Sequence, residues 1–153
     1  MKSVNTLIQL SAIALNAAFI GAMLLIALVL VPFWQASAPS VFLDWFGTYA
    51  ASLGSLMLPF GPGVLILAIL SFVLNRDKKL LWGLTILLTV ANILYFPVYF
   101  LPTNNAFVEQ TIPIAGVSGE LNNWLNYHWQ RIFFATGALI TSAIAVSRTM
   151  SRN

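Results

Sequence analysis

The run LIQLSAIALNAAFIGAMLLIALVLV, residues 7–31, decides the fold class of this chain. None of its residues is charged, and Pro32 follows it directly. A helix of this length measures roughly 37 Å, which is enough to cross the hydrocarbon core of a bilayer, about 30 Å thick, with some tilt. Residues 36–38, Ala-Ser-Ala, resemble a signal-peptide cleavage site, but the apolar part of a signal peptide is only about 7–15 residues long. We therefore expect residues 7–31 to remain as a membrane-spanning helix.

The composition of the whole chain agrees with that expectation. Of its 153 residues, 59% are hydrophobic and 7% are charged, whereas a soluble domain has about 25% charged residues. Such a chain cannot cover itself with a water-compatible surface, and no polar stretch is long enough to fold separately. We therefore expect one domain, residues 1–153, in a multi-pass protein of the bacterial inner (plasma) membrane.

Several classes of partner and cofactor are excluded by residues that are rare or missing. The net charge is +3, but the basic residues are scattered, without the basic and aromatic groove of a nucleic-acid-binding protein. Cysteine is absent, which excludes disulfides, iron–sulfur clusters and cysteine nucleophiles. A single histidine, with no carboxylate inside a span, falls short of any usual metal-ligand set. We expect no metal, no other cofactor and no nucleic acid, and membrane lipid as the surrounding partner.

Three further apolar segments follow, over about residues 50–74, 80–101 and 128–146, so the sequence predicts an all-α bundle of four membrane helices. The second segment contains Pro59-Phe60-Gly61-Pro62-Gly63, which cannot continue a regular helix. It is either one kinked span, or a helix along the membrane surface over residues 42–57 followed by a short span from Pro62. In both cases we expect the second helix to be broken at Pro59–Gly63.

The positions of the basic residues predict the orientation of the bundle. With four spans, only Arg131 falls on one side of the membrane. The other side receives Lys2, Arg76, Lys78, Lys79, Arg148 and Arg152. Because basic residues favour the cytoplasmic side, both termini are expected in the cytoplasm. The outer connections are then residues 33–49 and 102–127, and the second is expected to be a loop that caps the bundle.

Polar residues fall on one face of three predicted helices, at about 100° of rotation per residue. These stripes cover arcs of roughly 40° in the first segment and roughly 80° in the third and fourth. Their members are Asn5, Gln9 and Asn16 in the first segment, Thr85, Thr89, Asn92 and Tyr99 in the third, and Trp124, His128, Arg131, Ala135, Ala138 and Ser142 in the fourth, if that helix already begins near Leu121. Lipid disfavours polar side chains, so the stripes should meet inside the bundle. The plainest role for them is hydrogen bonding between helices, worth about 0.6–2 kcal/mol each.

The polar groups rise from the middle of the membrane to its outer face. Asn92 lies roughly 18 Å above the inner end of its span, and Tyr99, His128 and Arg131 lie near the outer edge. This arrangement predicts a polar pocket that opens outward rather than a continuous channel. No acidic residue lies within a span, which argues against a proton or cation pump.

Residues 124–131, WLNYHWQR, hold the only histidine and the only basic residue on the outer side. An ionisable group at membrane depth is a functional-site candidate, and Trp124, His128 and Arg131 are neighbours on one helix face. The structural interpretation is an aromatic belt, with Arg131 reaching to water. The functional interpretation is acid–base chemistry, because imidazole titrates near pH 6.5. The adjacent guanidinium and nearby asparagine amides would then stabilise the resulting anion.

These residues also carry a resemblance to a known family. The motifs are Gly21 with Pro32 in the first helix, the run 96–107 (FPVYFLPTNNAF) at the end of the third, and Trp124, His128 and Arg131 at the fourth. In these the chain resembles small four-helix membrane proteins related to anthrone oxygenases, a family largely without assigned functions. The resemblance implies a cofactor-independent oxygenase, in which an activated phenolic carbon acid loses a proton and its carbanion reacts with dioxygen. The broken second segment departs from the family pattern.

The leading hypothesis is a membrane protein that binds a hydrophobic, aromatic small molecule in the outward pocket and, as an enzyme, acts as a metal-free oxygenase. His128 is then the catalytic base, and Arg131 holds the developing anion. The expected substrate-binding residues are Trp124, Asn104, Asn105, Tyr99, Asn92 and Asn16. The alternative hypothesis is a non-catalytic structural or accessory subunit of a larger membrane assembly. The sequence leaves open whether the chain forms a homo-oligomer or part of such a complex.

Overall fold

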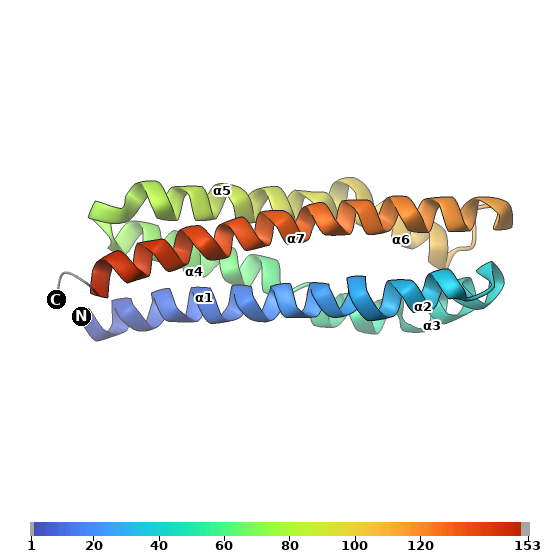
Figure 1. The fold of residues 1–153 in the computed structure, drawn as a ribbon, viewed down its shortest axis with the longest axis horizontal. Helices are drawn as coiled ribbons and strands as arrows, with labels where there is room; N and C mark the ends of the chain where they lie inside the picture. Colours follow the sequence, from blue (N-terminus) through green and yellow to red (C-terminus); the bar gives the residue numbers. More distant parts are fainter. Residues whose placement is uncertain (1, 151–153) are drawn as a thin grey trace.

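The chain folds into four long helical rods that lie side by side in an elongated bundle (Figure 1). The computed structural model describes residues 2–150, with side chains over residues 3–147. Rod 1 consists of α1 (Lys2–Leu25), the π-helical η1 (Ile26–Leu30) and α2 (Val31–Ala36), and rod 2 consists of α3 (Pro39–Met57) and α4 (Phe60–Leu74). Rod 3 consists of the 3-10 turn η2 (Arg76–Lys78), α5 (Lys79–Tyr95), the π-helical η3 (Phe96–Phe100) and α6 (Leu101–Val108), and rod 4 is α7 (Ile114–Met150).

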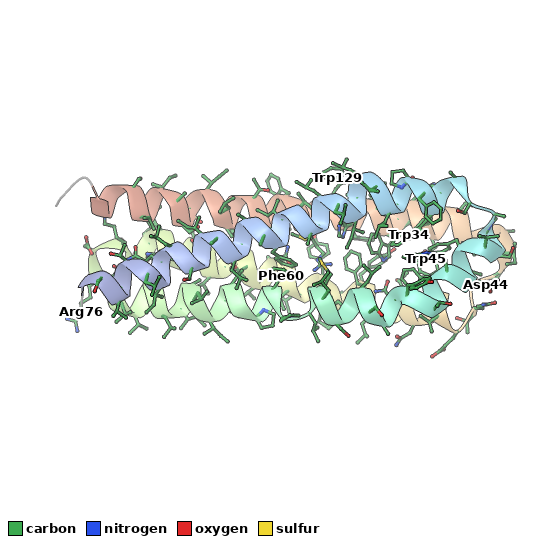
Figure 2. The ribbon with its side chains drawn as sticks, turned by 90° about the horizontal axis from the view of Figure 1, so that it is seen from below. Trp34, Asp44, Trp45, Phe60, Arg76 and Trp129 are labelled. Carbon is green, nitrogen blue, oxygen red and sulfur yellow. The ribbon has the colours of Figure 1, made fainter. Side chains whose placement is uncertain are left out.

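Each rod is long and apolar enough to cross a membrane, which confirms the predicted all-α, four-helix architecture. The four apolar stretches are Ser3–Ala36, Pro39–Leu74, Arg76–Val108 and Ile114–Ser147. The start of α1 and the end of α7 lie at the same end of the bundle (Figure 1). Arg76 lies at this end, called the Arg76 end below, and Asp44 lies at the opposite, Asp44 end (Figure 2). The side chains of Lys2, Arg148 and Arg152, which contribute to the predicted orientation, lie outside the described residues.

Two predicted helix ends are wrong, and both errors have the same cause. The first helix was expected to stop before Pro32 and the third near Pro102, yet both rods continue through α2 and α6. Each of these prolines follows a π-helical stretch, η1 or η3. The N–H of Val31 bonds to the carbonyl of Ile26, five residues back, and an equivalent bond closes η3. This wider turn accommodates the proline ring, which an α-helical turn would exclude.

The predicted outer connections are also mostly helical. Residues 33–49 belong to α2 and α3 apart from a short link, and the expected cap loop, residues 102–127, is interrupted only between α6 and α7. The glycines and asparagines of this region indicate a loop, but its apolar residues recur at helical spacing. These residues are Val117, Leu121 and Trp124, all buried in the hydrophobic core toward the Asp44 end. Burial of that stripe stabilises the helix despite the unfavourable residues around it.

Rod 2 is interrupted at Leu58 and Pro59, at the start of the predicted break. In a continuous helix the ring of Pro62 would collide with the carbonyl of Leu58, and Pro62 has no N–H to donate. Pro62 instead lies in the first turn of α4, where proline is tolerated. Gly63 is within α4 and allows rod 1 to approach, since a Cβ there would lie 2.8 Å from the Leu15 Cδ2 atom.

The predicted polar stripes face one another inside the bundle. The Oγ1 atoms of Thr85 and Thr141 are 2.8 Å apart and link rods 3 and 4. Asn16 donates from Nδ2 to the carbonyl oxygen of Ala135 at 3.1 Å, which links rods 1 and 4. These contacts are the interhelical hydrogen bonds expected of buried polar residues in an apolar bundle.

A cluster of amides ties rod 1 to rod 2 at the Arg76 end. Asn75 Oδ1 accepts from Asn5 Nδ2 at 2.9 Å and from Gln9 Nε2 at 3.1 Å. Asn75 Nδ2 donates to Asn5 Oδ1 at 3.0 Å and to the carbonyl of Ser71 at 2.7 Å. Asn75 begins the charged stretch 75–79, which the sequence indicates to be a solvated loop, but Asn75 is only 6% exposed. That interpretation is therefore wrong for Asn75, which is a structural residue.

The packing changes from small residues to aromatic residues along the bundle. Near the Arg76 end, the core contains the buried alanines Ala12, Ala68 and Ala145, which let the rods approach closely, around the large ring of Trp82. Toward the Asp44 end, the core is aromatic and centred on Trp34, whose ring contacts Phe42, Phe46 and Trp124 at centroid distances of 5.7, 5.6 and 5.8 Å. The break in rod 2 lies beside this aromatic core, and the core forms part of the wall of the cavity described next.

Candidate functional site

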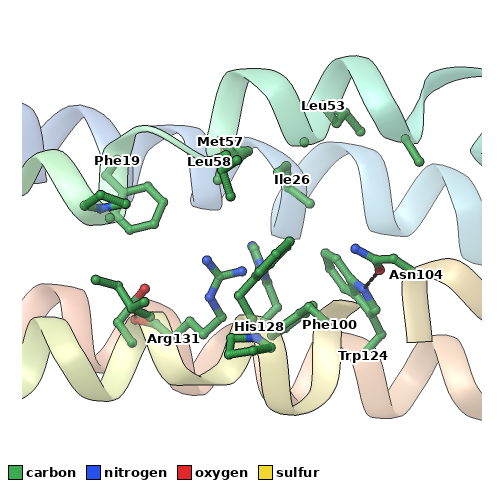
Figure 3. A pocket seen from close by; sticks show the side chains of 18 of the residues that line it. Phe19, Ile26, Leu53, Met57, Leu58, Phe100, Asn104, Trp124, His128 and Arg131 are labelled. Carbon is green, nitrogen blue, oxygen red and sulfur yellow. Dashed lines mark hydrogen bonds between the residues drawn. The ribbon is translucent and has the colours of Figure 1, made fainter. Parts of the chain in front are cut away.

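A cavity of about 160 Å³ lies beside the break in rod 2 and is lined by all four rods. Its walls are mostly apolar, with Phe19 and Ile26 from rod 1 and Met57 from rod 2 (Figure 3). The predicted site residues in its lining are Asn92, Asn104, Trp124, His128 and Arg131. The structure therefore brings five of the eight predicted site residues to one cavity.

Arg131 brings a positive charge into this cavity. Its residue is only 9% exposed, and its guanidinium points toward Met57 and Leu58 across the space (Figure 3). The guanidinium carbon lies 4.8 Å from the ring centre of Phe100 and 5.9 Å from that of Phe19. Its Nε has no hydrogen-bond partner, and no carboxylate among the described residues pairs with it. Because guanidinium stays charged in proteins, the cavity contains a buried cation without a counter-ion.

His128 offers an unprotonated ring nitrogen beside that charge. The residue is 1% exposed, and its Nε2 lies 2.9 Å from the carbonyl oxygen of Met23. A carbonyl only accepts hydrogen bonds, so Nε2 carries the proton and donates it to Met23. In the neutral imidazole Nδ1 then has a free lone pair, and it has no partner among the described residues. This is the protonation state that a general base requires.

Aromatic contacts fix the orientation of the imidazole. The ring of Trp124 stacks on His128 with centroids 4.8 Å apart and an angle of 17° between the planes. Phe100 meets Trp124 edge-on at 5.0 Å and 90°. The indole Nε1 of Trp124 donates to Asn104 Oδ1 at 2.9 Å, as the dashed line in Figure 3 shows. Asn104 of rod 3 thus fixes the orientation of Trp124, and stacking on Trp124 fixes that of His128.

Asn92 contributes an amide oxygen at the inner side of the cavity. Its Nδ2 donates to the carbonyl oxygen of Arg131 at 2.7 Å, which fixes the orientation of the amide because that carbonyl can only accept. The Oδ1 atom is buried and has no partner in the described part of the chain. Asn92 therefore leaves one amide oxygen unsatisfied beside the cavity.

Three predicted substrate-binding residues lie outside the cavity lining. Asn16 is engaged with the backbone of rod 4, as described above. Tyr99 donates its hydroxyl to Glu120 Oε1 at 2.6 Å and packs on Tyr127 at a centroid distance of 4.1 Å. Asn105 is exposed, one position beyond Asn104. Each shares a helix with residues of the site, but the helical rotation directs it elsewhere.

The sequence did not reveal one deeply buried member of the lining, Trp34. Trp34 is 2% exposed, and its Nε1 has no hydrogen-bond partner among the described residues. A buried indole N–H normally finds a partner, so this donor is an unsatisfied polar atom in a residue that lines the cavity. In the sequence Trp34 follows Pro32, where the helix was expected to have ended, and only the π-helical turn of η1 brings it into the bundle.

The cavity opens at its side. The exposed residues of its lining are Leu58 and Pro62 beside the break in rod 2, and Pro97 in η3 of rod 3. All three are apolar. The sequence predicts an outward opening because it places His128 and Arg131 near the outer end of the fourth span. In the structure, rod 4 extends well beyond these residues, to Ile114.

The residues of this mostly apolar lining include one buried positive charge and three buried polar atoms without partners among the described residues, which are His128 Nδ1, Asn92 Oδ1 and Trp34 Nε1. Such a set can bind an anion, or can remove a proton and stabilise the anion that forms. Among the described residues no three His, Cys, Asp or Glu side chains come together as a metal site.

Comparisons with family models, with curated proteins and with solved structures find no match to this chain.

Proposed function

We propose that this protein binds a hydrophobic small molecule with an acidic oxygen or carbon acid, that His128 accepts its proton, and that Arg131 holds the anion. The observation that carries the proposal is the guanidinium of Arg131, buried without a counter-ion at the wall of a cavity. A buried charge without a partner raises the free energy of the folded protein by several kcal/mol. A ligand anion that pairs with the guanidinium would lower that free energy, which favours binding. The aromatic walls favour a flat, apolar ligand body.

The membrane placement is part of this proposal. The four rods cross the bacterial plasma membrane, with the Arg76 end in the cytoplasm. Rods of 33–36 residues are longer than the hydrocarbon core needs, about 20 residues. The Asp44 end, with the exposed Tyr49 and the half-buried Trp45, then lies in the outer headgroup region, where tryptophan and tyrosine are favoured.

The resemblance to anthrone oxygenases gives this chemistry a specific form. His128 takes a proton from the CH₂ group of an anthrone, and the carbanion donates electrons to dioxygen as a C–O bond forms. Loss of water then leaves a ketone, so one CH₂ group and one O₂ give one C=O group and one H₂O. The protein supplies the base, the positive charge and a chamber that excludes water.

The binding proposal is tested with 2-naphthol, whose absorption spectrum changes when its hydroxyl ionises. We expect naphthol bound to the wild-type protein in nanodiscs to show the naphtholate spectrum at neutral pH. His128→Gln should bind naphthol in its protonated form, and Arg131→Gln should bind it at least 10-fold more weakly. Asn105→Ala, which is exposed and outside the cavity, is the matched control and should behave as wild type. A protonated naphthol spectrum in the wild-type protein would contradict the proton transfer.

The oxygenase step has its own test. Purified protein in detergent is mixed with an anthrone, and oxygen uptake is measured with an electrode. Wild type and Asn105→Ala should consume oxygen at equal rates, and His128→Gln should consume it at least 100-fold more slowly, in the range of general-base effects. Equal uptake by wild type and His128→Gln excludes the catalytic role of the histidine.

A further inference from the structure

We infer that the ligand enters this cavity sideways, from the hydrocarbon of the bilayer, through the opening between rods 2 and 3 at the helix break. The ligand class is a membrane-dissolved amphipath that carries its acidic group into the cavity and leaves its apolar body toward the lipid. This inference rests on the proposed function, and it adds a route and a source for the ligand.

The rim of the opening is apolar. Leu58 is 59% exposed, and Pro62 and Pro97 are also exposed, while the other lining residues are buried or half-buried. A mouth that faced water would be expected to expose polar side chains. The charge of Arg131 and the ring of His128 lie behind this rim, at the inner wall. The lining therefore becomes more polar from the rim inward, which suits an amphipath that enters with its polar group first.

The helix break produces the opening and makes it tolerable in lipid. Beside the break, rods 2 and 3 approach closely at Gly61, where an added Cβ would lie 3.0 Å from Ile93 Cγ1. Backbone N–H groups without partners are costly in hydrocarbon. Pro59 and Pro62, at the start of α4, have no N–H groups, so two of these unpaired donors are absent.

The opening lies at the depth of the outer half of the hydrocarbon. Counted along the helix from Leu74, at the Arg76 end of rod 2, Leu58 is roughly 24 Å away. Counted from Lys79 in rod 3, Pro97 is roughly 27 Å away. Both distances are within a hydrocarbon core of about 30 Å that begins at the charged turn between rods 2 and 3.

The route from the outer aqueous side is closed by Trp34. A second, more polar hollow lies toward the Asp44 end and is lined by Gln35, Ser118 and Asn122. Trp34 lines both this hollow and the cavity, and it is only 2% exposed. Its ring is held by aromatic contacts to Phe42 at 5.7 Å and others. A ligand from water would have to displace this ring, whereas a ligand from lipid passes only the apolar rim.

The absence of cysteine allows a clean test, in which the opening is plugged through one introduced thiol. Leu58→Cys is reconstituted in phosphatidylcholine nanodiscs and modified with benzyl methanethiosulfonate, and 2-naphthol association is followed by stopped-flow fluorescence. We expect modification to slow both association and dissociation at least 10-fold, with little change in Kd, and dithiothreitol to restore the rates. The matched control is Leu25→Cys, because Leu25 is 57% exposed and lies outside the cavity lining. Its modification should leave the rates unchanged.

A second plug tests the aqueous route. Ser118→Cys, in the outer hollow, is modified with a charged methanethiosulfonate, and the same rates are measured. Slower binding after modification at Ser118 but not at Leu58 would overturn the side entrance. Unmodified protein that shows no saturable 2-naphthol binding contradicts the proposed function, whereas saturable binding with rates insensitive to the Leu58 plug contradicts only the route.

A measurement without any ligand keeps the route testable on its own. Met57 lines the cavity and is half-buried, so Met57→Cys reports which reagents reach the interior. We expect N-phenylmaleimide dissolved in the bilayer to label it at least 10-fold faster than a membrane-impermeant sulfonated maleimide. Faster labelling by the impermeant reagent would show a path from water and would contradict the inference.

Discussion

Replacing Arg131 by methionine is expected to make the protein more stable and less able to bind. Methionine has a similar length but no charge, so the substitution removes the uncompensated cation from the cavity wall. Exchanging buried ionic groups for apolar ones of similar volume is often neutral or stabilising by about 1–4 kcal/mol. The lost contacts with the rings of Phe100 and Phe19 offset about 0.5–2 kcal/mol of that stabilisation. The hydrogen bond from Asn92 is retained because it goes to the backbone of residue 131.

Taken at the middle of these two ranges, the expected net gain in the free energy of unfolding is about 1 kcal/mol. It can be measured by unfolding the protein with dodecyl sulfate in mixed micelles, followed by circular dichroism. Arg76→Met is the matched control, since Arg76 is exposed at the end of the bundle, and an exposed substitution usually changes stability by less than about 0.5 kcal/mol. In the same preparation, 2-naphthol binding by Arg131→Met should fall about 10- to 100-fold, the equivalent of losing a hydrogen bond to a charged group.

The opposite result would refute the reasoning. If Arg131→Met lost about 2 kcal/mol or more while Arg76→Met did not, the guanidinium would be a satisfied structural group. The cavity would then contain no vacancy for an anion, and the resemblance alone would support the proposed chemistry.

Two further substitutions test other parts of the structure. Asn75→Ala removes the centre of the amide cluster between rods 1 and 2 and should lower the free energy of unfolding by about 1–3 kcal/mol. Asn105→Ala, at an exposed position, should leave it unchanged. Equal effects of the two substitutions in the same mixed-micelle titration would show that the cluster is not structural. Gly54→Leu and Gly21→Leu introduce the same side chain at helix positions where a Cβ meets no atom within 4 Å, and both should be at least as stable as wild type because glycine is a poor helix former. Only Gly54 lines the cavity, so only Gly54→Leu should weaken 2-naphthol binding, by at least 10-fold in a fluorescence titration, and a loss in both variants would speak against the cavity as the binding site.

The sequence predicted the architecture well because it depends on long-range averages. Apolar length gives the four rods, and helical rotation places Thr85, Thr89 and Asn92 on one face of the third segment, the face that is buried in the structure. Rotation could also be used to group His128, Arg131 and Trp124 on one face. These properties depend only on spacing within one helix, which the sequence states directly.

The errors in the prediction have local causes. A proline normally indicates a helix end, but rod 1 continues past Pro32 because the π-helical turn of η1 precedes it. Such turns leave no clear pattern in a single sequence. Trp34 therefore could not be assigned to the site. The direction of the opening also could not be predicted, because it depends on how far rods 2 and 3 separate beyond Gly61, which is a property of packing.

The most direct test of the central claim compares 2-naphthol with its methyl ether, 2-methoxynaphthalene, in wild type and in Arg131→Met. The two probes have nearly the same apolar body, but only naphthol can give an anion to Arg131. A cavity of about 150 Å³ holds benzene, so both bicyclic probes would extend from this cavity, of about 160 Å³, into its opening. The account predicts that wild type binds naphthol at least 10-fold more tightly than the ether, and that this preference disappears in Arg131→Met. Equal affinities in the wild-type protein, or a preference that survives in the variant, would contradict it.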